Sequence, residues 1–354
     1  MNPKVSFIVA IYNVEPYIRE CLESLREQKE KNIEFLLIDD GSTDLSGSIC
    51  EEYAIMDNRF QVFHQENKGV SVARNKGIEM AAGDWLCFVD GDDMVDPKLM
   101  NNLQFEQFSE CDLIFFGYNN LYANGKHEKR ALPNLSVPNL DHKDMLDLSH
   151  GILNGDIDKC KKYQNTCFSY HEPWGKLYNK KFIDEYNLRY QIGIKRGQDS
   201  LFNFEVYQCA KKALFEPVIG YYYRKNQLSI SNRYNPQITE SYVELINAFW
   251  NVIEKNKCKQ DYIQDAYLMG IRSFLYCCKI DFCHENNEKN YSERKKDFLR
   301  VRNMEIYRLC FENANYSKLR LNVRFSAILC KYHFFAAFML FWRIYDCMKN
   351  YKNK

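Results

Sequence analysis

Acidic side chains gather at two places in the sequence, each directly after a run of apolar residues. The first group is Asp39–Asp44 (DDGSTD) and the second is Asp90–Asp93 (DGDD). Neighbouring carboxylates repel one another and raise each other's pKa, and a cation relieves that repulsion. Carboxylate oxygens suit Mg²⁺ or Mn²⁺, above all when phosphate oxygens complete the coordination shell. The two groups therefore indicate a metal-bridged diphosphate as the ligand.

The same residues also have an ordinary structural interpretation, because Asp-Gly and Ser-Thr-Asp are common in turns and helix N-caps. That alternative stays open for three of them taken singly: Asp39, Asp44 and Asp93. Asp40, Asp90 and Asp92 together favour a binding site, because all three lie where an open α/β sheet binds its ligands.

The elements that carry these acids alternate along the first 120 residues. Apolar runs rich in β-branched residues predict strands, and apolar residues at helical spacing predict helices. We expect strands at 5–11, 33–38, 60–63, 85–89 and 113–118, and helices at about 16–25, 49–54, 70–82 and 97–108. Strand and helix alternate with short links, so the fold class is α/β, with a doubly wound, mostly parallel sheet. Residues 119–232 are mixed and the pattern is helical from about 237, so we expect a domain over 1–232 and a helical C-terminal domain over 233–354.

Composition narrows the class of protein. Of 354 residues, 46% are apolar and 27% are charged, which excludes a disordered chain. The 48 basic and 47 acidic residues leave a formal net charge of +1, so we expect no nucleic-acid partner. Fourteen cysteines are spread without the spacing of a zinc module, and the start runs directly into a strand. These features predict a cytoplasmic protein with free thiols.

Four blocks in order, VSFIVAIYN, FLLIDDGSTD, NKGVSVARNKGI and GDWLCFVDGDD, closely resemble the family 2 glycosyltransferases, which have the GT-A fold. The resemblance is strong over about residues 3–100 and weaker through about 230. It implies an enzyme that moves a sugar from a nucleotide diphosphate sugar to an acceptor hydroxyl, with inversion of the anomeric centre. It also implies a nucleotide-sugar half over about 1–118 and an acceptor half over about 119–232.

The resemblance implies roles for the strand ends. Ala10 and Tyr12 would lie against the nucleobase and ribose, and Asp40 would accept a hydrogen bond from the base, usually uracil. Asp90 would face the ribose or the metal shell. Asp92 would ligate a divalent cation, Mn²⁺ or Mg²⁺, that bridges the diphosphate.

Further residues follow from the same resemblance. Arg74 would contact the donor diphosphate or sugar, because a guanidinium fork matches phosphate oxygens; a surface arginine is the alternative. The stretch Gly197–Phe202 (GQDSLF) resembles the family's Glu-Asp pair, with Gln198 in place of the Glu. Asp199 would be the base that deprotonates the acceptor, and a helix N-cap is its structural alternative.

Two other stretches resemble blocks of the family on the acceptor and donor sides. In WGKLY, Trp174 could stack on a sugar face and Lys176 could steady the acceptor or the diphosphate; a buried Trp beside a surface Lys is the alternative. Arg224 follows three tyrosines in a stretch that resembles a segment closing over the donor, and it could offset diphosphate charge.

The C-terminal end is basic and aromatic. Residues 315–354 hold eight Lys and Arg side chains and one acid, Asp346. The uncharged run Tyr332–Trp342 is shorter than the roughly 20 residues that span a bilayer. Five aromatic residues crowd it: Phe334, Phe335, Phe338, Phe341 and Trp342. The segment at about 318–349 is therefore predicted to lie on an anionic membrane surface, peripheral on the inner face of the cell membrane, and a packed terminal helix is the alternative.

The function predicted from these features is metal-dependent transfer of a hexose-type sugar from a UDP-sugar to a hydroxyl of a glycan or lipid-linked acceptor, in surface polysaccharide or glycoconjugate synthesis. A non-catalytic sugar-nucleotide binding protein is one alternative. The other is a phosphatase of the haloacid dehalogenase type, whose DxDx(T/V) motif resembles Asp90–Met94 but normally follows the first strand rather than the fourth.

Overall fold

The computed structural model describes residues 4–122, 127–128, 130–132, 139–155, 166–225, 234–255 and 259–352. The chain divides into two compact units. The first contains Met1–Ile152 and Ile157–Leu228, and the second contains Leu153–Asp156 and Ser229–Lys354. The predicted domain boundary after residue 232 lies outside the described residues.

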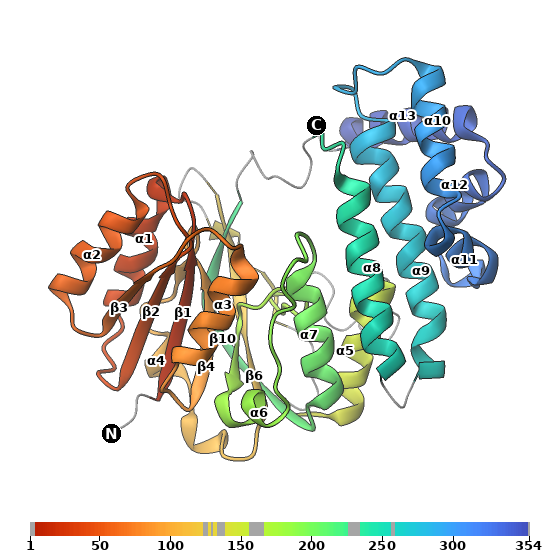
Figure 1. Cartoon of the computed structure of the whole chain (residues 1–354). Helices are drawn as coiled ribbons and strands as arrows, with labels where there is room; N and C mark the ends of the chain where they lie inside the picture. The colour runs from red at the N-terminus through yellow and green to blue at the C-terminus, as the bar shows by residue number, and fades with distance from the viewer. Residues whose placement is uncertain are drawn as a thin grey trace. The chain divides into compact units, whose positions relative to one another are not determined.

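A ten-stranded sheet forms the centre of the first unit, as far as the structure describes it, in the order β3-β2-β1-β4-β9-β6-β10-β5, with β7 beside β6 and β8 beside β10 (Figure 1). The strands are β1 Val5–Ile11, β2 Ile33–Asp39, β3 Phe60–His64, β4 Trp85–Asp90, β5 Met94–Val95, β6 Leu113–Tyr122, β7 His127–Glu128, β8 Asn139–Asp141, β9 Lys176–Asn179 and β10 Lys212–Lys225. β1 pairs in parallel with both β2 and β4, and β2 pairs in parallel with β3. The short β9 is antiparallel to both of its neighbours, β4 and β6. The predicted α/β class with a mostly parallel sheet is confirmed.

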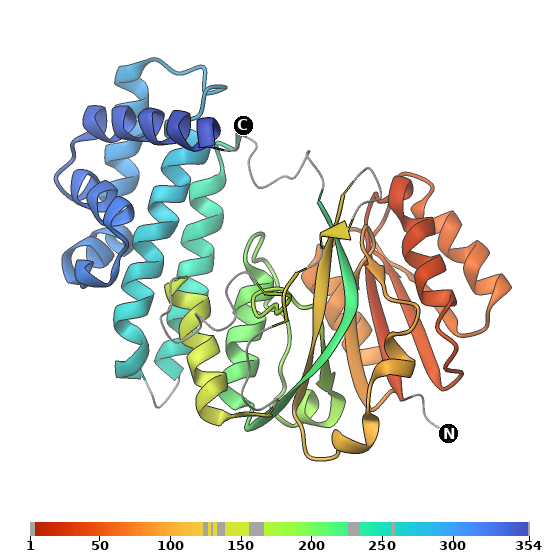
Figure 2. The same ribbon diagram turned by 180° about the vertical axis from the view of Figure 1, so that it is seen from behind.

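Helices cover both faces of this sheet. They are α1 Glu15–Arg26, α2 Ser46–Met56, α3 Val70–Met80, α4 Leu99–Asn102, α5 His142–Asn154, α6 Lys180–Glu185 and α7 Gln198–Cys209. Alternate residues of a strand point to opposite faces. In β1, Phe7 and Val9 join a core with α1 and α2. Ile8 meets α3 instead, where a Cβ on Gly77 would lie 2.2 Å from its Cγ2. Figure 2 shows α1 and α2 from their own side of the sheet.

Aromatic packing fixes α7 on the same face as α3. Phe88 pairs in register with Ile8, so both point to that face. The Phe88 ring contacts Tyr178, Tyr190 and Phe202, and Tyr190 stacks on Phe202 of α7 with 4.2 Å between ring centroids. This cluster holds the amino end of α7 beside the sheet.

The prediction of one helix over residues 97–108 is wrong. The structure has the short α4, then a 3₁₀ turn at Phe105–Gln107. Leu103 leaves the helix with an extended backbone, at φ −79° and ψ 135°. Leu103 and Phe108 are both buried, and Phe108 packs edge-on against Trp85. Burying Leu103 and Phe108 requires the chain to leave the helix at Leu103. The spacing of the apolar residues resembles that of a helix and does not show this break.

The second unit is helical, as predicted. Its helices are α8 Ile238–Lys255, α9 Lys259–Cys277, α10 Tyr291–Arg302, α11 Glu305–Asn313, α12 Leu321–Lys331 and α13 Phe335–Lys352, and a π-helical turn Cys278–Phe282 follows α9. Phe274 of α9 meets Phe298, Tyr307 and Phe311 edge-on. No helix within the described ranges combines the length and the apolar character that crossing a bilayer requires. Each of the eleven cysteines whose side chains are described is a free thiol, as expected.

Candidate active site

The carboxyl ends of β1, β2 and β4 meet at one edge of the sheet. Ala10 lies in register with Ile38 on one side and with Asp90 on the other. A cavity of about 440 Å³ opens there, lined by the strand ends at 10–12, by Asp40, by the start of α3 and its preceding loop, and by residues 90–92. Five of the predicted site residues line it: Ala10, Tyr12, Asp40, Asp90 and Asp92.

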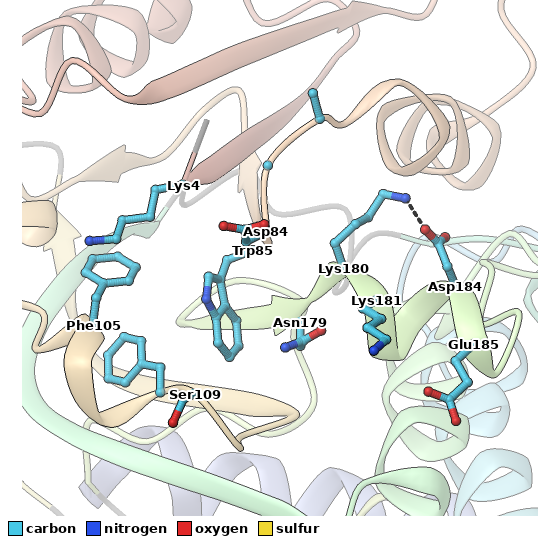
Figure 3. Close-up of a pocket in the computed structure, with 13 residues that line it drawn as sticks. Lys4, Asp84, Trp85, Phe105, Ser109, Asn179, Lys180, Lys181, Asp184 and Glu185 are labelled. Carbon is cyan, nitrogen blue, oxygen red and sulfur yellow. Dashed lines mark hydrogen bonds and ion pairs between the residues drawn. The ribbon is translucent and has the colours of Figure 1, made fainter. Parts of the chain in front are cut away.

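A larger hollow of about 860 Å³ lies at the other edge of the sheet, beside the first residues of β1 and β4 (Figure 3). Trp85 and Phe105 line it, and Lys180 and Asp184 form an ion pair at its rim. It contains none of the predicted site residues. Open α/β sheets bind ligands beyond the carboxyl ends of their strands, so the smaller cavity is the candidate site.

Asp40 is buried beside this cavity, and its carboxylate holds the loop 65–69 that forms part of the lining. One carboxylate oxygen accepts hydrogen bonds from the side chain of Gln65, at 2.7 Å, and from the N–H of Lys68, at 2.9 Å. The other accepts from the N–H of Gly69, at 2.7 Å. A carboxylate offers about four acceptor sites, so one is left for a ligand. Gly41 has φ +73°, and a Cβ there would lie 2.8 Å from the backbone nitrogen of Asn67, so the turn after Asp40 requires glycine.

The acids after β4 divide into two kinds. Asp90 and Asp92 are part-exposed and face the cavity, whereas Asp93 is buried. Burial, and then the charge of Asp90, raise the pKa of Asp92 to about 6. Asp93 accepts hydrogen bonds from the hydroxyl of Tyr221 and the N–H of Arg224, both at 2.7 Å. Asp93 therefore fastens the loop to β10.

Arg74 joins the cavity to the amino end of α7. Its side chain is buried, and its Nη2 donates to Asp90 at 2.8 Å while its Nη1 donates to Asp199. The guanidinium also lies over the ring of Tyr190, 5.2 Å from the centroid. Contact of Arg74 with the donor diphosphate or sugar stays a prediction; in the structure both ends of its fork meet carboxylates.

Asp199 is the second residue of α7, and Gly197 occupies the N-cap with φ +71°. The N-cap is therefore Gly197, and the structural alternative of Asp199 as the N-cap is wrong. Its side chain is 28% exposed beside Arg74. Burial raises the pKa of Asp199 to about 6, against the lowering effect of Arg74 and with smaller increases from Asp90 and Glu172. A carboxylate with this pKa is ionised at neutral pH and is a stronger base than an ordinary Asp.

The charges around the cavity fit a divalent cation. Three carboxylates line it, and among the residues that the structure describes its lining includes no Lys, Arg or His. No three His, Cys, Asp or Glu side chains in the described part of the chain come together as a metal cluster. Asp90 and Asp92 alone would offer hard oxygen ligands, which suits Mg²⁺ or Mn²⁺ when the oxygens of a bound phosphate supply the remainder.

Comparison with known protein families decides the class of this site. The model for "Glycosyl transferase family 2" matches residues 6–209, which include the carboxyl ends of β1, β2 and β4 and also Asp199. The chain belongs to this family. The putative glycosyltransferase EpsH of Bacillus subtilis is 34% identical over 308 residues, covering 86% of this chain and 83% of that protein. The uncharacterized glycosyltransferase EpsJ of the same organism is 30% identical over 357 residues, covering 99% and 98%.

Solved structures agree on the fold. Residues 1–349 of S. aureus TarS superpose with a TM-score of 0.67 at 18% identity, covering 97% of this chain and 91% of that one. A mannosyltransferase from Pyrobaculum calidifontis, in complex with GDP-Man and Mn²⁺, gives a TM-score of 0.51 at 13% identity, covering 95% and 86%. The prediction of a family 2 glycosyltransferase, and hence of a transferase enzyme, is confirmed.

Two residues predicted for the acceptor side of the glycosyltransferase are not available to a ligand. Trp174 is 2% exposed, and its ring stacks on Tyr221 and Tyr223 with centroids 4.8 and 5.2 Å away. Lys176 is fully buried in β9 and donates to the backbone oxygen of Glu172. Burial lowers the pKa of Lys176 to about 7. Stacking of a sugar on Trp174 is therefore wrong for this structure, and so is a direct ligand contact from Lys176.

Arg224 supports the loop Asp90–Asp93 from outside the cavity. Its Nε donates to the backbone oxygen of Asp92 at 2.7 Å, and its Nη2 pairs with Glu20 of α1 at 2.8 Å. The guanidinium lies over Tyr17. The structure thus places Arg224 as a brace between α1 and the loop. The stretch predicted to close over the donor is β10 up to Lys225, and its later part, Ser229–Ser231, lies outside the described residues.

Two tyrosines that support the site were not among the predicted site residues. The hydroxyl of Tyr221 accepts from the N–H of Asp90, at 3.1 Å, and donates to Asp93, so it joins both ends of the loop. Tyr190 forms the floor beneath Arg74. Tyr221 is one of the three tyrosines before Arg224, in a stretch whose resemblance suggested no role for that side chain, and Tyr190 belongs to no motif.

Proposed function

We propose that this glycosyltransferase moves a hexose-type sugar from a UDP-sugar to a hydroxyl of a glycan or lipid-linked acceptor, with inversion, in the synthesis of a surface polysaccharide or glycoconjugate. The observation that carries the proposal is the position of Asp199. Arg74 forms ion pairs with both Asp199 and Asp90, so the carboxylate suited to act as a base lies close to the acid that lines the cavity.

The cavity has the parts that a uridine nucleotide needs. Tyr12 is 49% exposed at its rim and can cover the flat face of a base or ribose. Asp40 retains one free acceptor site for a base N–H, as argued above. The structure of S. aureus TarS in complex with UDP-GlcNAc supports a UDP-sugar, because its chain covers nearly all of this one with the same fold.

We assign Asp92, with Asp90, to hold the divalent cation. The cation would neutralise charge that develops on the departing nucleoside diphosphate. The complex of the Pyrobaculum calidifontis mannosyltransferase with Mn²⁺ supports a metal in this fold.

The remaining chemistry belongs to the chain itself. Asp199 takes the proton of the acceptor hydroxyl as its oxygen attacks the anomeric carbon from the face opposite the diphosphate. Arg74 holds the Asp199 carboxylate in place and keeps it ionised. A single displacement of this kind inverts the anomeric centre and requires no covalent sugar intermediate.

The test is release of UDP from a panel of UDP-sugars, with Mn²⁺ or with EDTA, followed by the Asp199→Asn variant. Loss of a general base should lower the rate by about 10²–10⁴-fold. Asp84→Asn is the matched control, because Asp84 is exposed at the opposite edge of the sheet. Tight UDP binding without turnover in the wild type would favour a non-catalytic binding protein and would contradict the proposal.

The cellular setting is part of the proposal. The relatives include a putative teichuronic acid biosynthesis glycosyltransferase of Bacillus subtilis, 36% identical over 126 residues, covering 35% of this chain and 50% of that protein. This relative supports a cell-surface polymer as the product. We place the enzyme in the cytoplasm, peripheral on the inner face of the membrane, where a lipid-linked acceptor would be reached.

A further inference from the structure

Large apolar side chains are exposed in unusual number on the last two helices. Across the described residues, seventeen large apolar or tyrosine side chains are exposed, and seven of them lie within Leu321–Ile344. Single exposed apolar residues are normal on any protein, but a cluster of them marks a surface that binds something. We name these seven residues the apolar face: Leu321, Phe325, Ile328, Tyr332, Phe334, Leu340 and Ile344.

On α12 the apolar face is a helical stripe. Leu321, Phe325 and Ile328 follow the i, i+4, i+7 spacing of one side of a helix. Their exposed fractions are 79%, 48% and 38%, whereas Ser326, Ala327 and Cys330 of the same helix are buried. The stripe that would normally pack on a core is therefore turned outward. Tyr332 continues it by one more turn, at 59% exposed.

The face extends onto α13. Phe325 meets Phe341 edge-on, with ring centroids 5.1 Å apart, which joins the two helices. Leu340 and Ile344 are exposed on α13, and Phe334 is exposed just before it. Figure 2 shows α13 on the outside of the second unit. The apolar face therefore has a continuous stripe on α12 and Tyr332, and further exposed apolar side chains at Phe334 and on α13.

The sequence alone had pointed to a different set of aromatic residues. Phe335 and Phe338, predicted for the interface, are buried against Phe298 of α10. They anchor α13 to the unit and leave its other side outward. The packed helix and the outward apolar face are therefore both present, on opposite sides of α13.

Basic side chains lie along one flank of the α12 stripe and on α13. Arg324 and Lys331 each precede a member of the α12 stripe by one residue, so both lie along one flank of it. Arg343 is exposed on α13 beside Ile344. Residues 313–344 contain no Asp or Glu. An apolar strip with a basic flank matches the interface of an anionic bilayer, where apolar side chains enter the acyl region and cations meet the headgroups.

We propose that the apolar face of α12 and α13 binds the surface of a membrane containing anionic phospholipid. The inference rests on the proposed function for its purpose, which is access to a lipid-linked acceptor, but its geometry is independent of the active site. A second copy of the chain fits less well, because the same face of a second copy carries no acidic side chain within residues 313–344 to pair with the basic ones.

The test is flotation of the full chain with vesicles of phosphatidylcholine, with and without phosphatidylglycerol. We expect recovery with the anionic vesicles, and the recovery should fall as salt is raised. The triple variant Leu321→Ser/Phe325→Ser/Ile328→Ser should reduce partitioning on the order of a hundredfold, since three apolar side chains no longer enter the bilayer. Arg343→Gln should reduce it about fivefold.

The matched control is Ile55→Ser/Met56→Ser, which removes two exposed apolar side chains from α2 and should leave recovery unchanged. Unaltered thermal melting and UDP binding of the triple variant would show that it folds. Equal recovery of the wild type and the triple variant would overturn the proposal. A dimer in light scattering that the triple variant converts to monomer, without vesicle binding by either, would also overturn it. UDP-sugar turnover is measured separately, so failure of membrane binding is distinguishable from failure of the proposed reaction.

Discussion

Replacement of Arg74 by Gln tests how the pKa of Asp199, the proposed base, is set. Arg74 donates to both Asp90 and Asp199, and its charge lowers the pKa of Asp199 while burial raises it to about 6. Gln keeps one polar group at this position but removes the charge. A neighbouring cation lowers the pKa of an Asp by about 1–3, so the pKa of Asp199 should rise from about 6 to between about 7 and 9.

The size of the effect follows from the ionised fraction. With a pKa of about 6, roughly nine-tenths of Asp199 is ionised at pH 7. With a pKa of about 8, roughly one-tenth is ionised, so turnover at pH 7 should fall about tenfold. The direction of the pH dependence follows from the role of the base. A base must be deprotonated to act, so turnover rises as the pH rises through the pKa of Asp199. The lost activity of Arg74→Gln should therefore return at alkaline pH.

The assay is kcat/KM for transfer, or for UDP-sugar hydrolysis, measured across pH for the wild type, Arg74→Gln and Arg74→Lys. Lys keeps the charge but cannot bridge two carboxylates, so we expect a smaller displacement of the profile together with a loss that pH does not restore. Arg26→Gln, an exposed arginine of α1 paired with Glu23, is the control. An Arg74→Gln profile that is uniformly lower but has the wild-type inflexion would refute the reasoning.

Three substitutions test the packing around the site. Trp174→Ala should lower the free energy of unfolding, measured by urea titration, by about 3–5 kcal/mol. Trp174→Phe should fold and keep the KM for the acceptor. A large rise in that KM would support the predicted contact of Trp174 with a sugar. Tyr221→Phe removes the partner of one Asp93 oxygen and of the N–H of Asp90, while the other Asp93 oxygen keeps the N–H of Arg224, and should cost about 1–3 kcal/mol, with Tyr222→Phe as its comparison. Gly77→Ala should lower the free energy of unfolding by about 1–3 kcal/mol because the new Cβ meets Ile8. If the loss in the double variant Gly77→Ala/Ile8→Ala equals the sum of the two single losses, the contact is contradicted.

The sequence predicted the parts of the fold that depend on continuous apolar runs. β1, β2 and β4 are long enough and apolar enough to be identified without neighbours, and acids at their carboxyl ends must meet at one edge of a parallel sheet. For that reason Asp40, Asp90 and Asp92 were correctly expected to lie together, and the structure places them in one cavity.

Pairing partners are where sequence reasoning failed. β9 is four residues long and lies antiparallel between β4 and β6, and nothing in its own pattern indicates this central position. Because β9 lies between β4 and β6, Lys176 is buried in the middle of the sheet rather than exposed on a surface. Trp174 enters the core immediately before β9 for the same reason. Motif residues that resemble ligand contacts can therefore be core residues when the strand beside them is central.

The ion pair of Arg74 with Asp199 shows the same limit at the centre of the chemistry. The two residues are 125 positions apart, and each was assigned a role toward the ligand rather than toward the other. Their meeting depends on α3 and α7 covering the same face of the sheet, which the ring stack of Tyr190 on Phe202 secures. Tyr190 also lies beneath the guanidinium. The packing that positions α7 thus also holds Arg74, whose charge lowers the pKa of Asp199. Core residues and the proposed catalytic residues therefore form one structure that no local motif encodes.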